Sequence, residues 1–255
     1  MSLHGTAARA GPACTLGGAA RRASVLLSTV AVALLRLATP AHAGIGLSAA
    51  VDSDDRVRGV SFSDGNPVLS LNLAYDHASG VYAGVSATAV ATDHNGVEML
   101  GDVVYLGYAG RLGAETSWDV GASNSNVSVY PDIAYRYNYT QLYAGITRNN
   151  ISAHLYYSPR YLGGGARTLY GEVNGSWKLA RRWRLFAHVG VLTSLGEGNL
   201  TYAGRTQFDG RLGVAREFGR CEVSVAWTTT SSGPDFPEGH RQSRNALVVG
   251  GAYNF

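Results

Sequence analysis

The sequence has few cysteines, few methionines and no hydrophobic run long enough for a membrane helix. Its 255 residues include two cysteines, Cys14 and Cys221, and two methionines. The apolar run Val25 to Leu35 has 11 residues, against the roughly 20 that a membrane-spanning helix needs. No stretch keeps an apolar period of 3.6 residues, so the pattern does not predict helices. These shortages argue against a disulfide-stabilised fold and against a helical membrane anchor.

Acidic residues are absent from the first 43 positions, which have the layout of a secretory signal peptide. This segment carries four basic residues, then the apolar run, then the small-x-small site Ala41-His42-Ala43 before Gly44. We therefore expect a signal peptide over residues 1–43 and one domain over residues 44–255. Cys14 leaves with the signal peptide, so the mature chain keeps a single cysteine and forms no internal disulfide.

Net charge is also small once the signal peptide is set aside. The whole chain has 21 basic and 18 acidic residues, formally +3. Without the four arginines of the signal peptide, 17 basic residues remain against 18 acidic ones, formally −1. No basic patch is left that would indicate nucleic-acid binding.

Glycine and tyrosine are plentiful, at 33 and 15 residues, and apolar residues alternate with polar ones along most of the mature chain. Alternation with period two predicts β-strands. In the final stretch, one face carries Leu247, Val249, Gly251, Tyr253 and Phe255. An alternating strand that stops on phenylalanine resembles the closing strand of bacterial outer-membrane barrels, so Tyr253 and Phe255 are candidates for a signal to the barrel assembly machinery.

The alternating segments number about 12, and short connections alternate with long ones. The short connections lie near residues 77–80, 111–114, 149–150, 180–182 and 219–220, and the long ones at 53–67, 92–96, 123–131, 159–167, 194–206 and 230–244. This pattern predicts an all-β fold, a single antiparallel up-and-down transmembrane β-barrel of about 12 strands. Trp118, Trp177, Trp183 and Trp227 near strand ends fit an aromatic girdle. The alternative is a soluble sandwich, in which the apolar face of 169–179 would be buried.

The polar faces of the predicted strands would line the barrel lumen. The candidate lumen or constriction residues are Arg58, Asp64, Glu172, Lys178, Arg184, His188, Asp209, Arg211 and Glu222. Because both charge signs are mixed, no strong ion preference is expected. Arg58 and Asp64 are expected to pair across the loop 53–67, which reads as a constriction or plug rather than a ligand site.

The segment from Ser53 to Pro67, SDDRVRGVSFSDGNP, resembles the opening motif of the Gcw_chp family of uncharacterised outer-membrane-type proteins. The stretch from Tyr75 to Gly84 is similar to the second block of that family. Two positions depart from the family pattern, which has an aromatic residue at Asp55 and usually glutamine at Phe62. The resemblance is clear over residues 51–90, and it implies a secreted barrel but no established activity.

Motifs for chemistry are few. The segment from His240 to Ala246 is faintly similar to the His-x-Ser-Asn-Ala motif of lipid A deacylases, but His240 and Ser243 are three residues apart instead of two and would point to different faces. Asp54 and Asp55 read as solvated carboxylates rather than an acid–base pair. The histidines and the mature cysteine lack metal-ligand spacing. We therefore predict no catalytic, cofactor-binding or metal-binding residues and no cofactor.

These observations favour an outer-membrane protein of a Gram-negative bacterium, exported through the periplasm. Its expected role is a narrow, porin-like passive channel for small solutes, or a structural envelope protein, with outer-membrane lipid as its surroundings. A lipid-modifying barrel enzyme and a protein that binds partners through its long loops are the alternatives.

Overall fold

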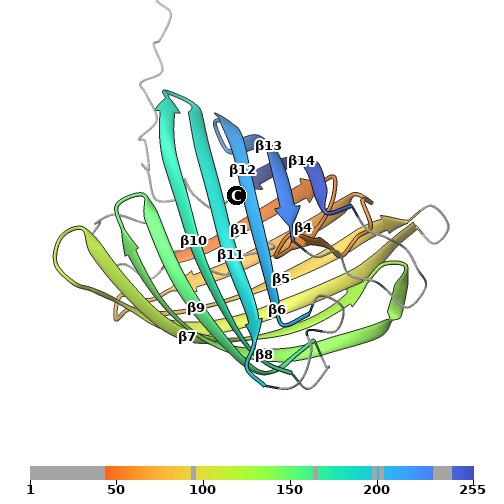
Figure 1. The fold of residues 1–255 in the computed structure, drawn as a ribbon. Coiled ribbons are helices and arrows are strands. Elements are labelled where there is room, and N and C mark those ends of the chain that lie inside the picture. Colours follow the sequence, from red (N-terminus) through yellow and green to blue (C-terminus); the bar gives the residue numbers. More distant parts are fainter. Residues whose placement is uncertain (1–43, 93–95, 163–165, 197–199, 201–203, 232–242) are drawn as a thin grey trace, which may run out of the picture.

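The computed structural model describes residues 44–92, 96–162, 166–196, 200, 204–231 and 243–255, and its regular elements there are all strands (Figure 1). The predicted signal peptide and His240 lie outside the described residues. Within the described residues, no helix has the length and apolar character needed to cross a membrane.

Twelve strands form one closed antiparallel barrel, which confirms the predicted fold class and strand number. Its strands are β1 (Gly44–Asp52), β4 (Val68–Asp76), β5 (Val81–Thr92), β6 (Gly96–Arg111), β7 (Thr116–Val129), β8 (Asp132–Arg148), β9 (Ile151–Tyr161), β10 (Ala166–Ala180), β11 (Trp183–Ser194), β12 (Thr206–Phe218), β13 (Cys221–Thr230) and β14 (Asn245–Asn254). Each barrel strand pairs with its neighbour along the chain, with β4 following β1. Two short strands, β2 (Arg56–Val57) and β3 (Val60–Ser61), pair only with each other.

The final stretch closes the barrel. Strand β14 pairs with β13 on one side and with β1 on the other, in a register that runs from Ser48 opposite Asn254 to Asp52 opposite Gly250. Closure gives every barrel strand two neighbours, so no edge strand faces lipid.

The apolar faces of the strands point outward, which confirms the membrane-barrel reading and shows the soluble sandwich to be wrong. On β10, Val173 is 45% exposed whereas the adjacent Glu172 is 3% exposed. Trp177, Trp183 and Trp227 are all exposed as well. An exterior of aliphatic and aromatic side chains around a polar interior is the arrangement of a barrel in lipid.

Five of the predicted short turns are observed, but the predicted loop at 123–131 is wrong. Strands β7 and β8 run through this region and leave only Tyr130 and Pro131 between them. Ser123 and Ser125 face the interior, each 4% exposed. Outside, the amides of Asn124 and Asn138 exchange hydrogen bonds of 3.2 and 3.1 Å. Such a polar strand resembles a loop in sequence, because both of its faces carry hydrogen-bonding side chains.

Two tyrosines of β8 face the interior rather than the lipid, whereas Tyr135 of the same strand is exposed. Tyr139 and Tyr143 are each 6% exposed. Glycines on neighbouring strands make room for such rings. A Cβ atom added to Gly121 would overlap the ring of Tyr143, and one added to Gly107 would overlap Tyr82. These glycines therefore make room for aromatic rings against the inner face of the wall.

Candidate functional site in the lumen

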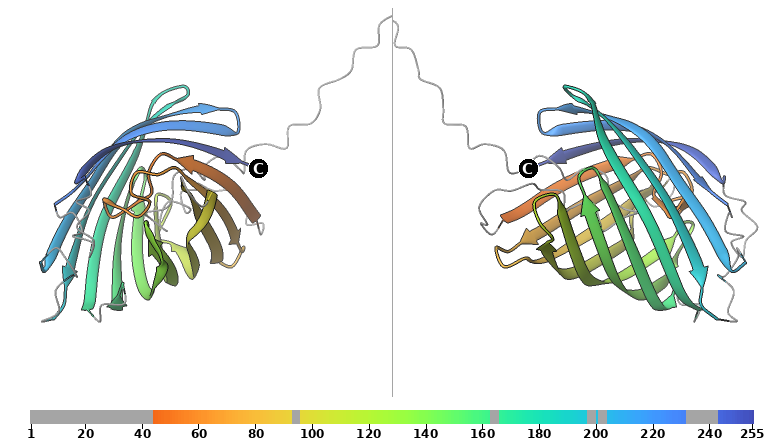
Figure 2. Two further views of the ribbon diagram at one scale, coloured as in Figure 1. Left: turned by 90° about the vertical axis from the view of Figure 1, so that its right-hand side faces the viewer. Right: turned by 60° about the vertical axis from the view of Figure 1, so that its left-hand side comes forward.

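The connection between β1 and β4, residues 53–67, folds into the barrel instead of extending away from it, and we call it the inward loop. Figure 2 shows this orange segment lying across the opening of the barrel. Its core is the β2–β3 hairpin, in which Arg56 pairs with Ser61 and Val57 with Val60. The two tip residues, Arg58 and Gly59, have φ angles of 52° and 76°. Positive φ at both central positions is the requirement of a type I′ turn, the tightest common hairpin connection.

The inward loop is attached to several sides of the wall. At its start, the Ser53 amide donates to the Val249 carbonyl of β14 at 2.9 Å. At the tip, the Gln207 side chain of β12 donates to the Arg58 carbonyl at 3.0 Å. At its far end, Phe62 packs with Val90, Leu100 and Val129, and its carbonyl accepts from the Tyr130 amide at 2.8 Å. The loop therefore spans the lumen from β14 to the turn between β7 and β8.

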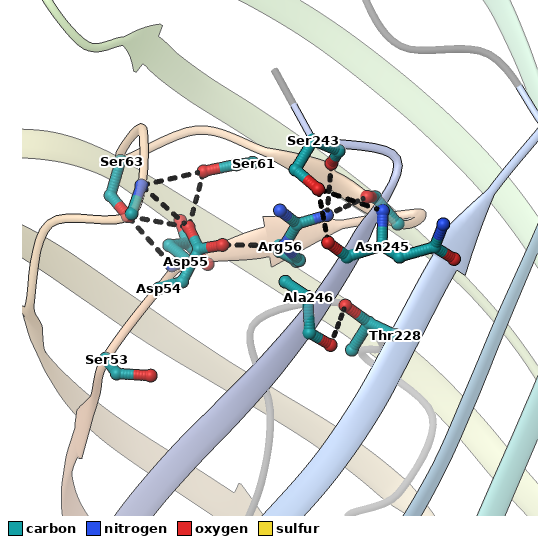
Figure 3. A network of polar contacts seen from close by, with 12 residues as sticks. Ser53, Asp54, Asp55, Arg56, Ser61, Ser63, Thr228, Ser243, Asn245 and Ala246 are labelled. Atoms are coloured by element: carbon teal, nitrogen blue, oxygen red, sulfur yellow. Dashed lines mark hydrogen bonds and ion pairs between the residues drawn. The ribbon is translucent and has the colours of Figure 1, made fainter.

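Asp54 holds the hairpin together (Figure 3). Its carboxylate accepts from Arg56 Nε at 2.6 Å, from Ser63 Oγ at 3.1 Å and from the hydroxyl of Ser61. Asp54 and Asp55 are 7% and 5% exposed, so the expectation that both are solvated is wrong. Burial raises the pKa of Asp55 to about 8, with a further contribution from Asp52 and Asp54. Asp55 lies in a loop, which is why its burial escaped prediction from sequence.

Arg58 and Asp64 do not form the expected pair. The Arg58 guanidinium lies over the rings of Tyr170 and Tyr161, with its carbon 4.0 and 4.8 Å from the two ring centroids. Asp64 is exposed in a second turn, at a φ of 52°. The ion pair within the inward loop joins Arg56 to Asp54 instead. The tip thus places a buried cation among aromatic rings of β9 and β10, where cation–π attraction stabilises it.

Below the tip, predicted lumen residues of β10 to β13 meet. His188 Nε2 lies 2.7 Å from Asp209 Oδ1, and Tyr170 donates to the same carboxylate. Arg184 donates to both oxygens of Glu222, at 2.6 and 2.8 Å. The other members of the predicted set are placed less tightly: Arg211 lies over the Phe186 ring, and Lys178 is exposed near the turn to β11.

Glu172 connects these groups to residues that the sequence did not single out. It accepts hydrogen bonds from Tyr156 and Asn174, and the Asn174 amide oxygen lies 2.7 Å from His188 Nδ1. Beside Glu172, His154 lies opposite it in the register of β9 and β10, and Asp119 lies 3.2 Å from His154 Nε2 and accepts from Tyr82. Asp119 and His154 both fall on the side of the alternating pattern that faces the lumen. This alternation was the available signal in the sequence, but it did not show that two residues 35 positions apart would be in contact.

The arrangement is a polar lumen with its charges largely matched, narrowed by a segment of the chain itself. In the described residues, no group of three or more histidine, cysteine or carboxylate side chains could hold a metal ion. Ser243, from the region with faint similarity to deacylases, has its hydroxyl in a local turn with Asn245 and gives its carbonyl to Arg56.

The fold and this lumen define the class of the protein as a transmembrane β-barrel of the outer-membrane type. The NanC porin aligns over 82% of this chain and 100% of its own, at 8% identity and a TM-score of 0.56. A membrane protein crystallised in meso aligns over 83% of both chains, at 9% identity and a TM-score of 0.51. The KdgM porin, solved with disordered oligogalacturonate, aligns over 82% of this chain and 99% of its own, at 13% identity and a TM-score of 0.49. At these identities the similarity to the first two structures shows the fold alone, and the KdgM porin, with a TM-score below 0.5, adds no argument.

Within that class, the chain belongs to the Gcw_chp family, described as bacterial proteins of unknown function, whose model matches residues 38–247. The match includes the whole inward loop and 11 of the barrel strands in full. The family resemblance seen in residues 51–90 is thereby confirmed. No curated protein matches this chain in sequence.

Proposed function

We propose that the protein is a passive outer-membrane channel for small polar solutes, in which the inward loop forms the constriction. The observation that carries this proposal is the attachment of the hairpin tip inside the polar lumen, where Gln207 holds the Arg58 carbonyl and two tyrosines contact its guanidinium. A solute that passes through the barrel has to pass this tip.

The charge pattern supports weak selectivity rather than a strong preference for one ion. Arg184 faces Glu222, and Arg56 faces Asp54. His188 and His154 lie against Asp209 and Asp119. Matched pairs leave little net field along the path, whereas selective pores present rings of one sign.

Planar-bilayer conductance of the refolded protein tests the proposal. Asp55 and Phe62 are hydrogen bonded through their backbones, at 2.7 Å. Residues 56–61 can therefore be replaced by two glycines that close the shortened hairpin without disturbing β1 or β4. We expect this variant to show a larger unitary conductance than the native chain, because the tip no longer reaches the tyrosines of β9 and β10.

A pair of point variants provides the matched control. Arg58→Gln removes the buried cation at the tip, whereas Arg160→Gln removes an exposed one from the same side of the barrel. Conductance is expected to change with the first and not with the second, and a heat-dependent gel shift shows that both are folded. If the native and shortened proteins fold but conduct no ions, the barrel is a structural envelope protein and the channel proposal fails. Equal conductance of the two would show that the hairpin is not the constriction.

A further inference from the structure

Arg216 is a charged residue on the lipid-facing side of the wall, and the proposed channel function does not involve it. The outward row of β12 runs Phe208, Gly210, Leu212, Val214, Arg216 and Phe218. Phe208, Leu212 and Phe218 are all exposed, as expected of residues that meet lipid. Phe218 follows Arg216 in this row, so a lipid-facing aromatic side chain lies between the arginine and the end of the strand.

Two aromatic rings hold the Arg216 side chain. Its guanidinium carbon lies 5.1 Å from the ring centroid of Trp183 and 4.9 Å from that of Phe218. Trp183 is directly opposite Arg216 in the register of β11 and β12. Cation–π contacts at these distances orient a guanidinium while leaving its N–H groups free to donate.

The positive charge around Arg216 has no acidic partner in the part of the chain that the structure describes. No carboxylate there lies within ion-pairing distance of Arg216, Arg181, Arg182 or Arg220. Glu217 alternates to the inner face, where it lies opposite Glu222. By contrast, Arg148 on the other side of the same rim pairs with Glu115 at 3.8 Å. Four arginines without an ion-pair partner among the described residues therefore lie together at the end of the barrel formed by β10 to β13.

This end carries the short turns, which face the periplasm in bacterial outer-membrane barrels. The turn Arg181-Arg182 is fixed beside Arg216, because the Glu217 amide donates to the Arg182 carbonyl at 3.0 Å. A guanidinium here lies at the level where the headgroups of the inner leaflet begin, and guanidinium groups bind phosphate oxygens through paired N–H donors.

We propose that Arg216, held between Trp183 and Phe218, binds the phosphate of an anionic phospholipid of the inner leaflet, and that Arg181 and Arg182 supply the preference for a negatively charged headgroup. The acyl chains of that lipid would lie along the outward row of β12. This inference is independent of whether the lumen conducts.

The experiment measures lipid that stays bound to the folded protein. The native protein and its variants are exchanged into detergent with equal amounts of phosphatidylglycerol and phosphatidylcholine, and the retained lipids are counted by mass spectrometry. We expect the native protein to retain phosphatidylglycerol roughly fivefold better, the preference that about one additional surface cation provides. Arg216→Gln should lower the retention of both lipids, because both carry the phosphate that it is proposed to bind. Replacing Arg181 and Arg182 by glutamine should remove most of the preference, and Trp183→Leu should reduce retention while the charge is unchanged.

Arg136→Gln is the matched control, because Arg136 is an exposed arginine of the outward row of β8 near the opposite end of the barrel. It should retain the preference of the native protein, and the gel shift should be the same for all variants. Equal lipid retention by the native protein and Arg216→Gln would overturn the proposal. Displacement of the retained lipid by millimolar inorganic phosphate would overturn it as well, because the site would then bind free phosphate rather than a lipid headgroup.

Discussion

At the scale of single residues, the lumen combines buried charges with partners that come from distant strands. Arg184 and Glu222 are an example, because the guanidinium donates to both carboxylate oxygens while the Glu222 side chain is 7% exposed. A buried carboxylate that loses its partner retains the cost of dehydration without the attraction. Such pairs therefore make the lumen sensitive to the removal of one member and less sensitive to the removal of both.

We expect Arg184→Ala to lower the free energy of unfolding by about 2 kcal/mol, because it leaves the Glu222 carboxylate buried without its ion-pair partner. The Arg184 side chain is 23% exposed, so the loss should be smaller than for a fully buried pair. Adding Glu222→Gln should restore part of the stability. Denaturant unfolding in detergent, monitored by the gel shift, provides the measurement.

The exposed pair of Arg148 and Glu115 is the control, with side chains 72% and 63% exposed. Arg148→Ala should lower stability by less than about 1 kcal/mol, since surface ion pairs contribute little. Equal losses for Arg184→Ala and Arg148→Ala would show that the lumen is hydrated like the outer surface and that the pair in the lumen is not effectively buried.

At the scale of elements, the inward loop differs from the strands because its position depends on side-chain contacts and a few single backbone hydrogen bonds instead of on a continuous ladder of sheet pairing. One of its buried groups is titratable in the ordinary pH range. The pKa of Asp55 is raised to about 8, mainly by burial, from an ordinary value of 3.8. Between about pH 4 and pH 8, Asp55 therefore keeps its proton in the docked loop and loses it in an undocked loop. The stability of docking should fall as pH rises from about 4 to about 8, and should level off above that.

Asp55→Asn tests this linkage, because asparagine stays neutral at every pH. Relative to the variant, conductance of the native protein should rise between pH 4 and pH 8, as the loop undocks more often. Other carboxylates titrate in both proteins, so the difference between the two curves isolates Asp55. Parallel curves for the two proteins would contradict docking controlled by this carboxyl group.

At the scale of the whole molecule, closure of β14 on β1 determines whether a barrel forms at all. Tyr253 and Phe255 stay a predicted assembly signal, and the structure places them outward, with ring centroids 4.8 Å apart. Replacing both by alanine should lower the fraction of folded protein that reaches the outer membrane in cells. Because both side chains are exposed, the refolded barrel should lose about 1 kcal/mol or less.

Leu247→Ala is the comparison for this prediction, because Leu247 lies on the same face of β14 and is 66% exposed. Its assembly in cells should match that of the native protein. If the double variant assembles as well as Leu247→Ala, the aromatic residues at the end of β14 are not read during assembly.

The sequence by itself determined the strands, their number and their two faces. Period-two alternation is a local property, and residues such as Val173 and Glu172 differ enough in polarity that lipid and lumen can each select one side. It failed where local polarity does not identify the environment, as in the segment 123–131, which was predicted to be a loop but belongs mainly to strand β7.

The tertiary structure alone decided the path of the inward loop and the pairs in the lumen. Arg58 was expected to meet Asp64, six positions away, but it lies over Tyr161 and Tyr170, because the hairpin turns the chain into the barrel. Asp119 of β7 meets His154 of β9, and Arg184 of β11 meets Glu222 of β13, each across one intervening strand. The physical reason is that the register of the strands in a closed barrel brings together side chains from different strands, and their distance along the chain does not indicate that they will be in contact.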